Sequence, residues 1–114
     1  MSDRLSMTFQ AMSDPARRAI LARLASGTAT VGELASPLAM TAPAVSHHLR
    51  VLERAGLVTR RARGQHRLIS LEPGGFGEAL GWLDRLRRFW DESFDRLDAE
   101  LARPEASDEG ESDG

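Results

Sequence analysis

The stretch that decides the fold of this chain is residues 30–56, TVGELASPLAMTAPAVSHHLRVLERAG. Thr30 and Glu33 have the spacing of a capping box, in which each side chain accepts a hydrogen bond from the backbone N–H of the other residue. A first helix is therefore predicted to begin at about Val31. It is expected to end near Pro37, because the residue before a proline avoids the helical region.

A second helix is predicted over residues 41–55, directly after a tight turn. Thr41 is suited to its N-cap, Pro43 to its first turn, and Gly56 to the left-handed position that ends it. Its inward positions are spaced i, i+4 and i+7: Val45, Leu49 and Leu52. Its outward positions are short at the start and basic further along: Ala42, Ser46, His47, Arg50 and Arg54. This arrangement is typical of a helix-turn-helix DNA-binding element.

The hydrophobic period changes from 3.6 to 2 after Gly56, in the sequence LVTRRARGQHRLISL. Residues 57–61 and 67–71 are predicted as two strands, joined by a Gly-centred loop at residues 62–66. A basic hairpin directly after a DNA-reading helix is a wing. Its arginines and Gln65 are expected to reach a phosphate or the minor groove.

Two helices are predicted before this stretch, and one long helix after it. Residues 4–12 carry Leu5, Phe9 and Met12 at apolar spacing, and residues 15–25 follow an SDP start signal. The inward positions of the second helix are Ile20, Leu21 and Leu24. The predicted fold is therefore mainly α with a small β-hairpin, a winged helix-turn-helix of order α-α-α-α-β-β-α with a long C-terminal dimerisation helix.

The long helix is predicted from about Phe76 to Ala102, and apolar residues recur along it: Phe76, Leu83, Trp90 and Leu97 every seven positions, with Leu80, Trp82, Leu86, Phe89, Phe94 and Leu101 beside them. This stripe is longer than one small domain needs to cover its core, so part of it is expected to pack on a second chain. The alternative is that it folds back on its own domain. The predicted dimer interface is Leu5, Phe9, Leu83, Leu86, Trp90, Phe94, Leu97 and Leu101.

Length and composition limit the remaining possibilities. The 114 residues predict one domain at 1–103 and a disordered acidic tail at 104–114, which has five acids and no basic residue. The chain has no cysteine, and no apolar run approaches the length of a membrane span. Its N-terminus also lacks the apolar region of a signal peptide, so a cytoplasmic protein without a membrane partner is expected.

The net charge of −2 conceals two halves of opposite sign. Residues 1–71 contain ten arginines and four acids, whereas residues 72–114 contain five arginines and thirteen acids. A basic half beside an acidic half fits a protein that presents one face to a polyanion. The expected contacts with double-stranded DNA come from the helix at 41–55 and the wing at 60–67: Thr41, Ala42, Ser46, His47, Arg50, Arg54, Arg60, Arg61, Arg63, Gln65, His66 and Arg67.

The chain resembles the ArsR/SmtB-type winged-helix transcriptional regulators of bacteria over about residues 8–100. The motifs that carry the resemblance are SDPARR at 13–18, VGELA at 31–35, AVSHHLRVLERAGLV at 44–58 and RGQ at 63–65. The resemblance implies a homodimer, joined through the first and last helices, that binds an inverted-repeat operator. It also implies that metal binding releases the DNA in many relatives.

Three positions bear on how far the resemblance extends. Relatives often have Gln and a basic residue where this chain has Ala42 and His47, so base preference does not carry over. His48 corresponds to a histidine common in the family, which favours a structural role in packing the helix against the wing over a base contact.

The resemblance implies two kinds of metal site, one with cysteines on the helix before the turn and one with Asp and His on the last helix, paired across the dimer. There is no cysteine, and the last helix offers only carboxylates: Asp84, Asp91, Glu92, Asp95 and Asp98. Carboxylates alone make weak and poorly selective sites for transition metals. His47 and His48 point about 100° apart on a helix, so they do not chelate one ion together. No metal and no cofactor are predicted, and any effector is unidentified.

Two alternatives stay open beside a DNA-binding regulator. One is a regulator of the same fold whose DNA binding is modulated by an effector or protein partner; the other is a winged-helix protein-interaction module that does not bind DNA. An enzyme is not expected, because the chain has no Cys, no Tyr, no nucleophile elbow and no Gly-rich phosphate loop.

Overall fold

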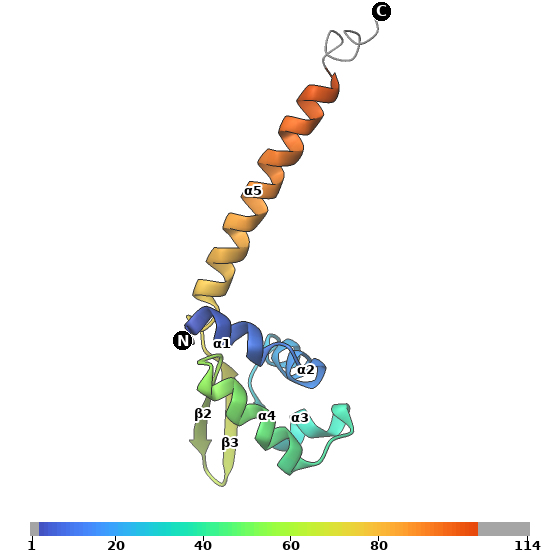
Figure 1. The fold of residues 1–114 in the computed structure, drawn as a ribbon. Coiled ribbons are helices and arrows are strands. Elements are labelled where there is room, and N and C mark those ends of the chain that lie inside the picture. The colour runs from blue at the N-terminus through green and yellow to red at the C-terminus, as the bar shows by residue number, and fades with distance from the viewer. Residues whose placement is uncertain (1–2, 103–114) are drawn as a thin grey trace, which may run out of the picture. The chain divides into compact units, whose positions relative to one another are not determined.

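The structure is a computed structural model that describes residues 3–102. The described part of the chain divides into two units, with the boundary between Ala79 and Leu80. The predicted tail, residues 104–114, lies outside the described residues. The first unit contains four helices and a small sheet, and the second contains most of the last helix (Figure 1).

The first two helices, α1 (Arg4–Ala11) and α2 (Pro15–Leu24), both begin at aspartate N-caps. The Asp3 carboxylate accepts a hydrogen bond from the Ser6 N–H at 2.7 Å, and the Asp14 carboxylate accepts one from Ala16 at 2.7 Å. Such side chains satisfy N–H groups that have no partner within the helix. Both helices end one residue earlier than predicted from sequence.

The helix-turn-helix consists of α3 (Val31–Leu38) and α4 (Ala42–Arg54). The predicted capping box is confirmed: Thr30 N–H donates to Glu33 Oε1 at 2.9 Å, and Glu33 N–H donates to Thr30 Oγ1 at 3.2 Å. Pro37 lies inside α3 and does not end it. The helix ends one residue later, at Leu38, where its C-cap Ala39 adopts a left-handed conformation with φ 54°.

The sheet has three strands, whereas the sequence predicted only a hairpin. Its strands are β1 (Ala29–Thr30), β2 (Val58–Arg63) and β3 (His66–Leu71), in the order β1-β3-β2 and antiparallel throughout. The two-residue β1 was missed because a period-2 pattern cannot be read from two residues.

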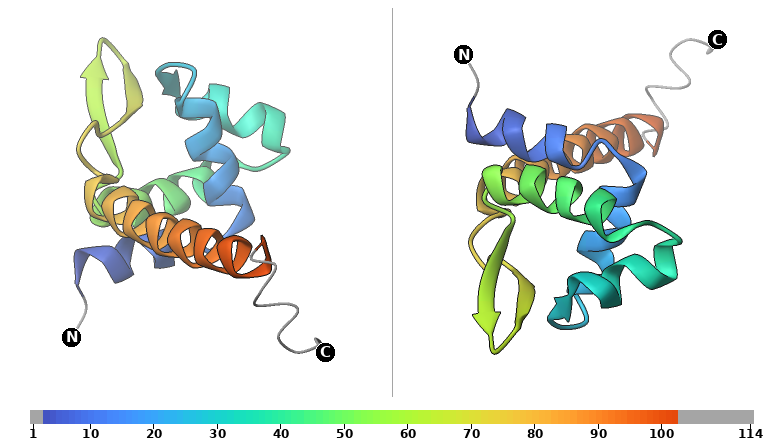
Figure 2. Two further views of the ribbon diagram at one scale, coloured as in Figure 1. Left: turned by 90° about the horizontal axis from the view of Figure 1, so that it is seen from above. Right: turned by 90° about the horizontal axis from the view of Figure 1, so that it is seen from below.

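The hairpin loop is also shorter than the predicted loop at residues 62–66. Arg63 pairs with His66, so the loop contains only Gly64 and Gln65, with Gly64 at φ +60°. Strand pairing therefore extends to the tip of the hairpin. The sequence did not predict this, because residues 62–67 show no alternation of apolar and polar side chains. The helix α1 lies on one side of α4, and the hairpin and α3 lie on the other (Figure 2).

The core of the first unit includes the apolar positions that the sequence predicted in α2 and α4, and it also takes in α3 and the sheet. Its largest fully buried apolar side chains are Ile20, Leu34, Val45, Leu49, Leu52, Leu57 and Ile69. From α1, Thr8 and Ala11 are buried in this core, while Leu5 and Phe9 are only half-buried. The Thr8 hydroxyl donates to the Arg4 carbonyl at 3.0 Å, which satisfies this buried polar group.

The last helix, α5, runs from Gly77 to Ala102. It begins one residue later than predicted, and Phe76 packs against the core of the first unit. Large apolar side chains along α5 are exposed: Leu80, Trp82, Leu83, Phe89, Trp90, Phe94, Leu97 and Leu101. None of the helices in residues 3–102 is both long enough and apolar enough to cross a membrane.

Candidate nucleic-acid interface

Burial of one face of α4 determines which side chains it presents to solvent. Val45, Leu49 and Leu52 are fully buried, so the opposite side carries the exposed His47 and Arg50. The exposed Arg54 lies four residues after Arg50 and seven after His47, and therefore on the same surface. Ser46 is half-buried at the edge of this surface, while Thr41 and Ala42 are exposed at its start. The Thr41 hydroxyl oxygen accepts a hydrogen bond from Ala44 N–H at 3.2 Å, which makes Thr41 the N-cap of the helix.

Strand pairing divides the basic residues of the wing between two faces of the hairpin. The pairs Arg61–Leu68 and Arg63–His66 place Arg61, Arg63 and His66 on the outer face. Arg67 shares the opposite face with Ile69, which is buried in the core. These arginines, His66 and Gln65 at the tip are all exposed.

Arg60 lies on the core-facing side of the hairpin and forms an ion pair with α4. Its Nε donates to Glu53 Oε2 at 3.1 Å, and its Nη2 donates to Glu53 Oε1 at 3.0 Å. The two side chains are only 22% and 32% exposed. The sequence prediction grouped Arg60 with the DNA contacts and gave Glu53 no role; in the structure the pair ties the wing to the end of α4. The sequence did contain a signal for this pair, because Glu53 is the only acidic residue in α4 and stands among basic residues.

His48 has a structural contact, but its partner differs from the prediction. Its Nδ1 lies 3.4 Å from Arg17 Nη1 in α2, whereas packing against the wing was expected. Arg17 also donates from Nε to the Ala11 carbonyl at 2.6 Å and from Nη2 to the Gln10 carbonyl at 3.3 Å. This one side chain therefore links the end of α1, the start of α2 and the middle of α4.

The surroundings of Asp14 at the start of α2 favour its charged form. Burial by itself raises the pKa of Asp14, but hydrogen bonds from the N–H groups of Ala16 and Arg17, at 2.7 and 3.3 Å, hold the pKa of this carboxyl below its ordinary value. The nearby His48 and the Arg17 guanidinium act in the same direction.

Most arginines among the predicted DNA contacts have no acidic partner in the described part of the chain. Within residues 3–102, no hydrogen bond or ion pair engages the side chains of Arg50, Arg54, Arg61, Arg63 and Arg67. On α5, by contrast, Arg87 and Arg88 pair with Asp84 at 2.7 and 2.9 Å. Positive charge without an internal counterion, gathered on α4 and the wing, is suited to binding the phosphates of a nucleic acid.

The described residues contain no cluster of three or more His, Asp or Glu side chains arranged to hold a metal ion. The rings of His47 and His48 are 5.7 Å apart and tilted by 58°.

The predicted dimer residues lie on both units. Leu5 and Phe9 in α1 and Leu86 in α5 are half-buried. The other predicted residues of α5 are exposed: Leu83, Trp90, Phe94, Leu97 and Leu101.

Comparison with known proteins identifies the family. A family model described as a helix-turn-helix domain matches residues 12–61. The HTH-type transcriptional regulator Rv2034 of Mycobacterium tuberculosis is 48% identical over 82 residues, which cover 72% of this chain and 74% of the relative. The transcriptional repressor SdpR of Bacillus subtilis is 33% identical over 79 residues, covering 69% of this chain and 88% of the relative.

A solved structure agrees with these sequence relatives. The crystal structure of an ArsR family transcriptional regulator superposes with a TM-score of 0.70 at 37% identity, covering 78% of this chain and 98% of that one. These relatives are transcriptional regulators, the class of protein that the sequence predicted. The chain thus belongs to the ArsR/SmtB-type winged helix-turn-helix transcriptional regulators.

Proposed function

We propose that this chain is a homodimeric regulator that binds an inverted-repeat operator, with α4 in the major groove and the wing on the phosphate backbone or in the minor groove. The observation that carries the proposal is the set of arginines on α4 and the wing that have no acidic partner within residues 3–102. Five such charges beside an exposed helix face match the electrostatic pattern of a DNA-binding surface.

The helix and the wing carry different kinds of contact in this proposal. Ser46, His47 and Arg50 lie on or beside the exposed face of α4, from which side chains reach base edges and flanking phosphates. Arg61 and Arg63 project from the outer face of the hairpin, and Arg63 adjoins its two-residue tip. A long basic side chain at such a tip is suited to phosphate or to the minor groove.

The second copy is proposed to pack on the apolar face of α5. Trp90, Phe94 and Leu97 are each at least half exposed, and the rings of Trp90 and Phe94 stack with centroids 5.9 Å apart. Large aromatic and aliphatic side chains gathered on one helix indicate a surface that another protein chain covers. A dimer also matches a palindromic operator, because a two-fold axis presents the same helix to each half-site.

The test begins with selection of bound sequences from a random DNA pool, which should return an inverted repeat. Binding of the selected operator and of scrambled duplex is then measured over a salt series. Replacing Arg63 with Ala should lower the log–log salt slope by roughly 0.9 for each phosphate that the wing no longer neutralises, and by about twice that for two wings, equally on both duplexes.

Changes on the helix should have a different effect. Replacing Ser46 or His47 with Ala should reduce discrimination between operator and scrambled DNA by about 1–3 kcal/mol for each good base contact. The assignment of the two surfaces would be reversed by two results together. The wing variant would lose only discrimination between the duplexes, and the helix variants would lose affinity equally for operator and scrambled DNA. No binding to any duplex would reject the proposed function.

A further inference from the structure

We infer that the pocket between α1, α2 and α4 binds a small amphipathic carboxylate, which regulates DNA binding through Arg54. The inference rests on the proposed function in one respect, because Arg54 is also one of the proposed DNA contacts. The binding itself depends only on the pocket.

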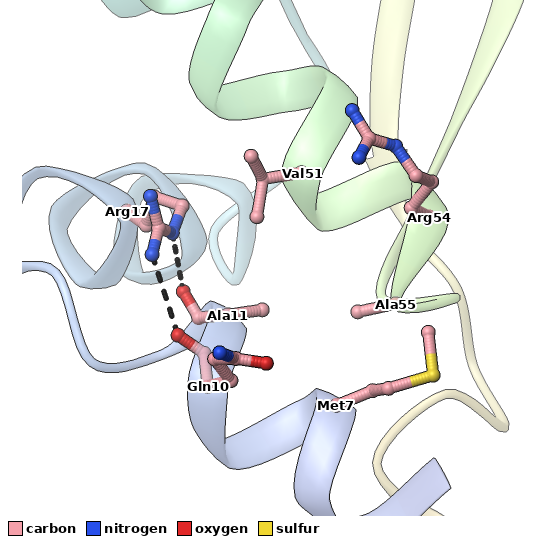
Figure 3. Close-up of a pocket in the computed structure, with 7 residues that line it drawn as sticks. All are labelled: Met7, Gln10, Ala11, Arg17, Val51, Arg54 and Ala55. Atoms are coloured by element: carbon pink, nitrogen blue, oxygen red, sulfur yellow. Dashed lines mark hydrogen bonds between the residues drawn. The ribbon is translucent and has the colours of Figure 1, made fainter. Parts of the chain in front are cut away.

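The pocket has an apolar floor and lies directly against α4. Its volume is about 290 Å³, and Met7 and Ala11 of α1 face Val51 and Ala55 across it (Figure 3). Ligand pockets usually measure roughly 300–1,000 Å³, so this one fits a small molecule with a short hydrocarbon chain or a single ring.

Arg17 and Arg54 lie on opposite sides of the pocket and differ in their partners (Figure 3). The Arg17 guanidinium is occupied by the carbonyls of Ala11 and Gln10 and by the ring of His48. No hydrogen bond or ion pair within residues 3–102 engages Arg54, so its guanidinium is free to accept a ligand.

The chemistry of the lining determines the class of ligand. A free guanidinium pairs with a carboxylate through two parallel hydrogen bonds, and the charge of Arg17 adds to the attraction for an anion. The apolar floor gains from burying hydrocarbon, whereas a small, strongly hydrated anion leaves that floor uncovered. A monocarboxylate with a short apolar body satisfies both parts of the pocket.

Binding at this place affects the DNA-binding surface directly. Val51 and Arg54 belong to the last turns of α4, and Arg54 lies on the same surface as Arg50 and His47. A bound carboxylate neutralises Arg54 and removes it from the phosphates. Because coupling between two ligands is reciprocal, the carboxylate lowers DNA affinity, and DNA lowers the affinity for the carboxylate by the same factor.

The experiment titrates the full chain with octanoate in the absence of DNA, and follows binding by calorimetry and by amide chemical shifts. The expected result is saturable binding, with shifts concentrated on α1 and the last turns of α4. 1-Octanol should bind at least tenfold more weakly, because it has the same chain without the charge. Arg54→Gln should weaken octanoate binding at least tenfold.

Arg50→Gln is the matched control, since it removes the same charge from an exposed position one turn earlier on α4, outside the pocket. Its octanoate affinity should stay within about twofold of wild type. Equal losses in the two variants, equal binding of octanol and octanoate, or no saturation by wild type would each overturn the inference. Octanoate that binds only by dissociating a dimer would also overturn it, because a second copy would then be the occupant of the pocket.

The two proposals fail in distinguishable ways. Octanoate binding that depends on Arg54 in a protein that binds no DNA would preserve the pocket and reject the proposed function. The opposite outcome is a protein that binds its operator, shows no saturable octanoate binding and is unaffected by octanoate. That outcome would support the proposed function and reject the ligand pocket.

Discussion

At the scale of single residues, partners decide which basic side chains are available to DNA. Arg60 and Arg61 are adjacent in sequence and have the same charge, yet they lie on opposite faces of the hairpin. Arg60 reaches Glu53 on the core side, whereas Arg61 is exposed on the outer side without an acidic partner among the described residues. The structure therefore places these neighbours differently: Arg60 pairs with Glu53 of α4, and Arg61 has an exposed side chain on the outer face.

The first prediction tests the positioning role of the Glu53–Arg60 pair. Glu53→Ala and Arg60→Ala should each weaken operator binding, because the wing loses its tie to α4. The charge swap Glu53→Arg with Arg60→Glu should recover most of that affinity, since it restores the pair and leaves the net charge unchanged. A double-mutant cycle on unfolding free energy should give a coupling of about 0.5–1 kcal/mol. Operator affinity in the swap that stays as low as in Arg60→Ala would show instead that Arg60 touches DNA.

At the scale of elements, each helix of the first unit begins at a side chain that caps it. Asp3, Asp14, Thr30 and Thr41 precede α1, α2, α3 and α4 respectively, and each accepts a hydrogen bond from an N–H of the first turn. Caps of this kind set where a helix starts, and so they set which of its faces meets the core. The cap of α2 is a carboxyl whose pKa is held below its ordinary value by hydrogen bonds from Ala16 and Arg17.

The second prediction uses the lowered pKa of Asp14. A carboxyl whose pKa is lower in the folded state than its unfolded value of 3.8 stabilises the fold above that value, and this stabilisation is lost as the pH falls through the folded pKa. Wild type should therefore lose more stability than Asp14→Asn between about pH 5 and pH 2. Asparagine is an equally good N-cap that does not titrate, which makes it the matched control. Parallel denaturant-unfolding curves for the two proteins across this range would contradict the prediction.

At the scale of the whole molecule, the chain joins a basic winged-helix unit to a long helix that carries exposed apolar side chains. In the first unit the core is closed by its own elements, with seven large apolar side chains fully buried. In α5 the ion pairs of Asp84 with Arg87 and Arg88 support the helix locally, and the hydrogen bond from Arg87 holds the pKa of Asp84 below its usual value. These ion pairs are themselves exposed, and eight large apolar side chains of α5 are exposed as well.

The third prediction concerns that surface. Burying a large apolar side chain is worth roughly 1.5–3 kcal/mol. Phe94→Asp combined with Leu97→Asp should therefore convert a dimer into monomers, as measured by sedimentation at micromolar concentration. Glu92→Asp is a suitable control, because Glu92 is an exposed, already charged position on the same helix. A wild-type monomer, or a dimer that persists in the double variant, would reject the proposed interface.

The fourth prediction concerns metals. Titration with Zn²⁺ or Ni²⁺ in a calorimeter should show weak binding, because the chain has no Cys and no His after His66. Any binding that is detected should be removed by changing His47, His48 or His66. Tight binding that is abolished on replacing Asp84 or Asp95 with Ala would demonstrate a metal site on the last helix and contradict this expectation.

Local interactions explain what the sequence by itself determined. The capping box at Thr30 and Glu33, the N-cap at Thr41 and the i, i+4, i+7 spacing of Val45, Leu49 and Leu52 involve residues within two turns of one another. Such patterns predict the helix-turn-helix and the exposed face of α4, because helix rotation follows from burying the apolar side.

Long-range contacts explain what only the tertiary structure decided. Three such contacts are the pairing of β1 with β3, the Glu53–Arg60 ion pair and the contact of Arg17 with His48. Each joins two different elements, and the pattern within one element does not predict which residues of another element it will contact. The rotation of α1 is of the same kind, since Thr8 rather than the more apolar Phe9 is buried. Local sequence sets the periodicity of an element; its neighbours in space select which side is buried and which charges remain free.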